Sequence, residues 1–177
     1  MPRLFTALEI PASISSDLSR LQNGLENARW IEPVDFHLTL RFIGDVTNQQ
    51  ANELTEQLEH IQTPEFKLHL DGLDYFGKSK PHSLIVKIKK NETLELLQSK
   101  HERLCQRLGL KTDSRKFSPH ITIARIGAVP IQQLAQYLSA NGYFKSSAFS
   151  VNGFCLYTAK SSTGGGPYAK LQRYPFP

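Results

Sequence analysis

Hydrophobic and polar positions follow two different periods along this chain. Residues 37–44 alternate with period two, as strands do, and residues 3–10 read as a short strand that Pro11 ends. Residues 13–25 and 48–61 instead place apolar side chains three and four positions apart, as helices do. Period two returns from Phe66 onward. The first half of the sequence therefore predicts a strand, a helix, a strand, a helix and a further strand region.

The second half of the sequence repeats this series and adds strands at its end. Its expected elements are strands over 83–88, 120–126, about 147–158 and 168–174, and helices over 93–108 and about 131–138. HLTLRFIG at 37–44 and HITIARIG at 120–127 carry His, Thr, Ile and Gly at matching places, and Phe149 follows Phe66 by the same 83 positions that separate the two octets. Such an insertion-free offset predicts an internal repeat.

The repeat also predicts the fold class. Two β-α-β-α-β units related by a pseudo-two-fold axis give an α+β, bilobal fold with mainly antiparallel sheets, outer helices and a central groove. We expect a single domain over residues 1–177, a length that suffices to bury a core. Its lobes are expected at about 1–77 and 78–177, with an exchange of terminal strands left open.

Charge is divided unevenly between the two halves. Residues 1–77 hold 5 Lys and Arg against 12 Asp and Glu, whereas residues 78–177 hold 16 against 4. Basic clusters occur at KSK 78–80, KIKK 87–90 and SRK 114–116. This asymmetry favours an anionic partner, with nucleic acid as the first candidate, over the alternative of an ordinary lysine-rich surface.

Composition also bears on location and thiol chemistry. The apolar run at the N-terminus is short and broken by Glu9 and Pro11, and no stretch reaches the roughly 20 apolar residues that cross a bilayer. We therefore expect a cytoplasmic protein without a membrane partner. Cys105 and Cys155 lack the spacing of a metal or redox motif and are expected as free, buried thiols.

A histidine opens each of the repeated strands. Strict alternation predicts one polar face on each, formed by His37, Thr39 and Arg41 on the first strand and by His120, Thr122 and Ala124 on the second. The same alternation predicts that Phe42 faces the core and that Arg125 does not lie on the histidine face. One histidine alone is most often structural, but two at matched places in a repeat favour a shared site. The other four histidines have no such partner and remain unassigned.

Two imidazoles and two hydroxyls suit displacement at phosphorus without a metal. One neutral imidazole accepts a proton from the attacking water, the other donates a proton to the departing oxygen, and threonine hydroxyls hold the non-bridging oxygens. A zinc site is the competing interpretation, but it needs three or four protein ligands and the motifs add only Asp35. Neither a metal nor a cofactor is therefore expected.

The doubled motif resembles a known family. HLTLRFIGDV and SPHITIAR, together with the opening RLFTALEIP, resemble the bacterial and archaeal RNA 2′,3′-cyclic phosphodiesterases of the two-histidine (2H) phosphoesterase superfamily, many of which are named 2′-5′ RNA ligases. The resemblance implies metal-independent opening of a terminal 2′,3′-cyclic phosphate to a 2′-phosphate. It implies His37 as the proton donor, His120 as the proton acceptor, and Thr39 and Thr122 as phosphate-binding residues. Pseudo-symmetry by itself does not order the two histidines.

Several features leave alternatives open. Arg41 and Arg125 are candidates for further phosphate contacts, although a structural role suits Arg125 equally well. The glycine run at 164–166 lacks the ending of a phosphate-binding P-loop, which favours a hairpin connection. The expected partner is RNA or a nucleotide with a terminal 2′,3′-cyclic phosphate, bound by a monomer. The alternative functions are a 2′-5′ RNA ligase or phosphodiesterase and, from another class, a non-catalytic RNA-binding module.

Overall fold

Strands and helices alternate along the chain in the order that the repeat predicts. The computed structural model describes residues 1–159 and 167–177, so the glycine run at 164–166 lies outside the described residues. The strands are β1 (Arg3–Glu9), β2 (Arg29–Trp30), β3 (His37–Asp45), β4 (Phe66–Leu68), β5 (Leu70–Phe76), β6 (Ser83–Ile88), β7 (His120–Arg125), β8 (Phe149–Val151), β9 (Gly153–Ala159) and β10 (Tyr168–Pro175). The helices are α1 (Ala12–Ser19), α2 (Asn48–Leu58), α3 (Glu92–Arg107) and α4 (Ile131–Asn141), with a 3-10 turn η1 at Pro33–Asp35. Within the described part of the chain, no helix is long and apolar enough to cross a membrane.

Some elements end earlier than their hydrophobic period predicts. Helix α1 ends at Ser19 rather than at Leu25. The next N–H groups, of Leu21 and Gln22, donate to the carbonyl oxygens of Leu18 and Ser19, three residues back, and Gly24 then takes a φ of +73°, outside the helical region. Helix α2 begins where Thr47 and Gln50 form a capping box. The strand region predicted from Phe66 is divided into β4 and β5. Local backbone signals therefore set boundaries that periodicity does not resolve.

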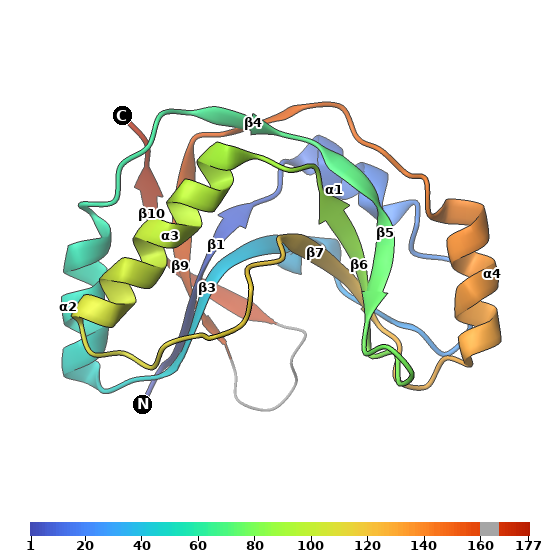
Figure 1. Cartoon of the computed structure of the whole chain (residues 1–177), viewed down its shortest axis with the longest axis horizontal. Coiled ribbons are helices and arrows are strands. Elements are labelled where there is room, and N and C mark those ends of the chain that lie inside the picture. The colour runs from blue at the N-terminus through green and yellow to red at the C-terminus, as the bar shows by residue number, and fades with distance from the viewer. Residues whose placement is uncertain (160–166) are drawn as a thin grey trace.

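The strands form two larger antiparallel sheets, each at the centre of a lobe. The first has the order β10-β9-β1-β3 and the second the order β2-β7-β6-β5, while β4 and β8 form a separate pair. Helices α2 and α3 lie against the first sheet, and α4 lies at the far side of the second (Figure 1). This α+β, bilobal and antiparallel arrangement confirms the predicted fold class.

Each large sheet takes strands from both halves of the chain. By the 83-residue offset β9 is the equivalent of β5, yet β9 lies beside β1 and β5 lies beside β6. The equivalent strands β4 and β8 pair with each other, and in that pair Lys67 lies opposite Ser150, its own counterpart in the repeat. The pseudo-two-fold axis therefore passes through this pair. The domain and lobe boundaries given above stay a prediction.

A register shift interrupts both histidine-bearing strands at the same place in the repeat. Against β1, strand β3 has two residues without a partner, Leu40 and Ile43, and against β6, strand β7 has one, Ile123. Ile123 follows Leu40 by 83 positions, so the shift next to each threonine is the one that the repeat shares. An extra residue of this kind reverses the alternation of side chains beyond it. The next side chain on the histidine face is therefore the third after each threonine, which is Phe42 in β3 and Arg125 in β7.

These bulges correct the faces predicted for four residues. Arg41 is only 4% exposed and bonds to α3, and Ala124 is fully buried, so neither lies on the histidine face. Phe42 is 37% exposed and lines the groove rather than the core, and Arg125 lines the groove as well. The prediction of these faces was wrong because it assumed an uninterrupted ladder of strand pairs.

Candidate active site

A pocket of about 390 Å³ between the two lobes brings together the four motif residues. His37 and Thr39 reach it from β3, and His120 and Thr122 reach it from β7, as the repeat predicts. The other lining residues are Arg3, Phe5, Ile31, Asp35, Phe42, Phe76, His82, Ser83, Arg115, Arg125, Ala159 and Tyr168. The pocket is therefore built from both large sheets and combines basic, hydroxyl and aromatic side chains.

Both motif histidines are held by the same backbone contact. The Nδ1 atom of His37 lies 2.8 Å from the carbonyl oxygen of Asp35, and the Nδ1 atom of His120 lies 2.7 Å from the carbonyl oxygen of Ser118. Because a carbonyl oxygen only accepts, each Nδ1 carries a hydrogen and donates it. The Nε2 atom of each ring is then the one that gains or loses a proton. A neutral ring thus offers a base at Nε2, and a protonated ring offers an acid.

Burial lowers the pKa of both histidines from the ordinary value of 6.5. For His37, burial acts first and the positive charges of His120 and Arg125 add to it, while the carbonyl and carboxylate of Asp35 partly oppose the shift. For His120, burial again acts first and the charge of Arg125 lowers the pKa further, against the hydrogen bond to Ser118. The free site therefore favours neutral imidazoles, and an anion placed between them favours a protonated one.

Aromatic rings lie against both imidazoles and explain part of this burial. The ring of His37 lies 5.0 Å from the centroids of both Phe5 and Tyr168, and the ring of His120 lies 4.8 Å from that of Phe76. Tyr168 and Phe76 meet the imidazoles edge-on. These contacts keep water from one side of each ring and restrict how far the ring can rotate.

Arg125 is fixed in the pocket by a hydroxyl group. Its Nη1 atom donates to Ser83 Oγ at 2.7 Å, and the same oxygen lies 2.8 Å from Nδ1 of His82. Because the buried Ser83 hydroxyl accepts from Arg125, its own hydrogen is available to His82. Burial lowers the pKa of Arg125, but a guanidinium group stays charged in proteins. The pocket thus presents an oriented cation close to both histidines.

Arg41, in contrast, holds the scaffold together. Its guanidinium group donates to the carboxylate of Glu102 in α3 and to the carbonyl oxygens of Phe42 and Lys111. These bonds tie β3 to the helix and to the segment that leads to β7. The expectation that Arg41 shares a face with His37 is therefore wrong, and its contacts are those of a structural anchor.

The two cysteines are free and buried, as predicted. Burial raises the pKa of Cys105 to about 11 and that of Cys155 to about 12, so neither is a thiolate near neutral pH. Within residues 1–159 and 167–177, no group of three or more His, Cys, Asp or Glu side chains is arranged to hold a metal ion. The polar side chains that line the pocket include its histidines, its hydroxyl groups and the arginines Arg3, Arg115 and Arg125.

Sequence reasoning missed the aromatic side chains of the pocket, together with Ser83 and His82. Phe5, Phe76 and Tyr168 lie in strands outside the two histidine motifs, and tertiary packing brings them to the histidines. Ser83 and His82 reach the pocket at the start of β6. No local signal in the sequence marks these five residues, because each becomes relevant only through strands that are distant along the chain.

Comparison with known proteins finds relatives for this chain, and a family profile matches each half of the repeat separately. The family profile described as LigT-like phosphoesterase matches the chain twice, over residues 8–86 and 86–168. The chain is 29% identical over 130 residues to the RNA 2′,3′-cyclic phosphodiesterase of Bacillus subtilis (strain 168), covering 70% of this chain and 71% of that protein. It is 30% identical over 146 residues to the RNA 2′,3′-cyclic phosphodiesterase of Aeropyrum pernix, covering 78% of this chain and 83% of that protein. The structure of E. coli LigT complexed with NADP+ is similar with a TM-score of 0.77 and 25% identity, covering 99% of this chain and 97% of that one.

Proposed function

Because this chain belongs to the LigT-like phosphoesterase family, we propose that it hydrolyses terminal 2′,3′-cyclic phosphates of RNA to 2′-phosphomonoesters. The observation that carries the proposal is the matched pair of histidines in one pocket, each with Nδ1 bound to a carbonyl oxygen and Nε2 left for proton transfer. The names of the B. subtilis and A. pernix relatives support the same activity.

In the proposed reaction the two histidines act on opposite sides of the phosphorus atom. Nε2 of His120 accepts a proton from water as the water oxygen bonds to phosphorus. Nε2 of His37 donates its proton to the 3′ oxygen as the bond between that oxygen and phosphorus breaks. The products are a 2′-phosphate and a 3′ hydroxyl group, and proton exchange with solvent restores both rings. The family resemblance assigns this order, and the pH experiment described below tests it.

The non-bridging oxygens need donors, because negative charge on them grows as the water attacks. We assign this role to the hydroxyl groups of Thr39 and Thr122, which occupy matched places beside the two histidines. Arg125 adds a charged donor whose direction is fixed by Ser83. Donors from both lobes thus hold the phosphate between the acid and the base.

Substitution of the four motif residues tests the proposal. We expect His37→Ala and His120→Ala each to lower turnover by at least about 10²-fold, because each removes an acid or a base. Thr39→Ala and Thr122→Ala should lower turnover less, because water replaces part of a lost donor. The measurement is hydrolysis of an oligonucleotide that ends in a 2′,3′-cyclic phosphate, with EDTA present and folding checked by circular dichroism.

The exposed His60 supplies the matched control, and His60→Ala should keep the full rate. Near-normal turnover in a folded His37 or His120 variant would contradict the assignment. Diesters with 2′-5′ and 3′-5′ linkages belong in the same assay, because in-line displacement serves those reactions too. Binding of the oligonucleotide without turnover of any of these substrates would instead indicate an RNA-binding module.

A further inference from the structure

A second hollow, of about 470 Å³, opens directly from the histidine pocket on the side of α3. The two cavities share Thr39, Phe42, Phe76, His82, Arg115 and His120. The second hollow does not reach His37 or Thr122, and its remaining wall comes from Leu40 and Arg41 of β3, from α3 and from residues 113–118. It is therefore continuous with the pocket but lacks the complete pair of histidines.

The charges in this hollow leave one cation available. Arg41 is paired with Glu102, and Arg115 is paired with Asp113 at 3.0 Å, a contact that lowers the pKa of the Asp113 carboxyl group to about 2. Lys116 lines the same wall and is exposed, and within the described part of the chain it forms no ion pair. After both pairs are neutralised, the ammonium group of Lys116 is the charge that remains for an external anion.

Aromatic side chains line the hollow beside this cation. Phe42 stands where the two cavities meet, is 37% exposed, and has the guanidinium group of Arg3 over its ring at 5.1 Å. Phe117 lies in the wall next to Lys116. Exposed rings stack on nucleic acid bases with little preference for sequence, and a nearby lysine binds the backbone phosphate. An aromatic ring for the base and an ammonium group for the phosphate together suit the binding of one nucleotide.

Contacts at both ends tie the segment that carries Lys116 to the rest of the fold. Arg41 donates to the carbonyl oxygen of Lys111 at its start, and the backbone N–H of Arg115 donates to the Asp113 carboxylate at 3.1 Å. His120 follows as the first residue of β7. A segment anchored at both ends loses less conformational freedom when a ligand binds than a free segment would.

From these contacts we infer that the second hollow binds the nucleotide that precedes the terminal one in an RNA substrate. The inference rests on the proposed function, which places the cyclic phosphate in the pocket between both histidines. A terminal nucleotide with a cyclic phosphate has a neighbour only on its 5′ side, and that neighbour must leave the pocket through a connected space. In the hollow, Lys116 contacts the phosphate that joins the two nucleotides and Phe42 stacks on a base. The preferred substrate is then an RNA end rather than a mononucleotide.

The test compares adenosine 2′,3′-cyclic phosphate with the dinucleotide ApA that carries the same terminal group. In the unmodified protein we expect kcat/KM to be at least tenfold higher for the dinucleotide. Lys116→Glu should reduce the ratio of the two kcat/KM values at least fivefold, and Lys116→Arg should preserve it. Lys67→Glu makes the same charge change at an exposed position of β4 outside both cavities, and it should leave the ratio unchanged.

Equal kcat/KM values for the two substrates, or an equal loss for both in Lys116→Glu, would overturn the inference and leave the proposed function standing. A binding measurement separates the two ideas further. Calorimetry with ApA 2′-phosphate and adenosine 2′-phosphate needs no turnover, and we expect tighter binding of the dinucleotide that depends on Lys116. If the dinucleotide binds more tightly but the protein hydrolyses neither of the two cyclic-phosphate substrates, the second site is supported and the proposed reaction is contradicted.

Discussion

At the scale of single residues, each motif histidine has its own backbone carbonyl partner, and this contact decides which ring nitrogen performs proton transfer. The contacts of His37 to Asp35 and of His120 to Ser118 occupy matched places in the repeat. They orient both rings before a ligand arrives, and they favour the tautomer of each neutral ring that carries its hydrogen on Nδ1. The same contacts make the two rings chemically similar. Their distinct roles must therefore come from the substrate and from their unequal surroundings.

These surroundings predict the pH dependence of the proposed reaction. One histidine must be protonated and the other neutral, so kcat/KM should follow a bell whose limbs report the two pKa values of the free protein. Both pKa values are lowered from 6.5, mainly by burial, so the maximum of kcat/KM is expected below pH 6.5. In the kcat profile the bound anionic phosphate should move the alkaline limb to higher pH. Steady-state rates with a cyclic-phosphate oligonucleotide across this range provide the measurement.

Single substitutions then order the two histidines. Replacing only the acid should abolish the alkaline limb and spare the acid limb in the residual activity, and replacing the base should do the opposite. Chelator should leave the whole curve unchanged. A rate that rises steadily with pH and disappears with EDTA would show that a metal-bound hydroxide attacks, and it would contradict the two-histidine mechanism.

At the scale of elements, the sequence predicts the strands and helices well but not the path of β3 and β7 beyond their threonines. Periodicity identifies an element because one face is buried over its whole length. A bulge depends on pairing with a distant strand, and neither Leu40 nor Ile123 has a local feature that marks it. Comparison of the two repeats does not reveal the bulge either, because both copies carry it and the offset of 83 residues is preserved.

Helix α3 contains a buried histidine that should make stability depend on pH. His101 is 1% exposed, its Nδ1 donates to the carbonyl oxygen of Leu97 at 2.9 Å, and its ring packs edge-on against Phe154 at 4.5 Å. Burial lowers its pKa to about 4, so the folded protein binds fewer protons than the unfolded chain between pH 4 and 6.5. The free energy of unfolding should therefore fall as pH falls through this window, by up to about 3 kcal/mol from this residue.

The variant His101→Phe removes this titration and keeps an aromatic ring against Phe154. Urea denaturation at several pH values should show a shallower loss of stability between pH 4 and 6.5, with part of the slope remaining because His37 and His120 also have lowered pKa values. His60→Phe replaces an exposed histidine and serves as the control. An identical slope in His101→Phe and in the unmodified protein would exclude His101 as the cause.

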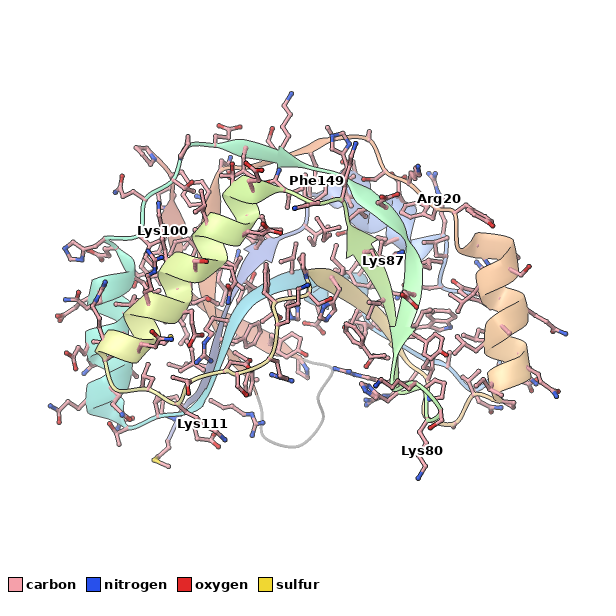
Figure 2. The ribbon with its side chains drawn as sticks, viewed as in Figure 1. Arg20, Lys80, Lys87, Lys100, Lys111 and Phe149 are labelled. Carbon is pink, nitrogen blue, oxygen red and sulfur yellow. The ribbon has the colours of Figure 1, made fainter. Side chains whose placement is uncertain are left out.

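At the scale of the whole molecule, the basic half of the sequence does not form one basic lobe. Helix α3 and strands β9 and β10 belong to the second half of the chain but lie with the first sheet. Figure 2 shows Lys80 at the β5–β6 connection of one lobe and Lys111 on the segment after α3 on the other side of the molecule. The exchange of strands therefore distributes the basic residues of the second half over both lobes.

Basic side chains on both lobes predict that binding of longer RNA depends strongly on salt. Each contacted phosphate of a single strand should contribute a slope of about −0.7 to the dependence of log K on log salt concentration. An oligonucleotide with a terminal cyclic phosphate should therefore lose far more affinity between about 50 and 200 mM salt than a cyclic mononucleotide. Fluorescence anisotropy measures the first affinity, and competition against the labelled oligonucleotide measures the second.

A charge reversal at the exposed Lys80 extends this measurement. Lys80→Glu should make the slope of log K against log salt concentration shallower for the oligonucleotide, by about 0.7, the contribution of one phosphate contact. The slope for the mononucleotide should stay unchanged. Equal salt dependence of the two ligands would mean that these lysines only solvate the surface.

The exchange of β5 and β9 decides how the two lobes can move. Strand β9 completes the sheet of β1 and β3, β5 completes the sheet of β6 and β7, and β4 pairs with β8 where the two connections run side by side. A lobe joined by a single linker can swing on it, but here a wider opening of the groove must strain two connections at once. We therefore expect the two lobes to move less against each other than lobes joined by one linker would, and we expect the spacing of the two proton-transfer groups to be similar before and after an RNA end enters.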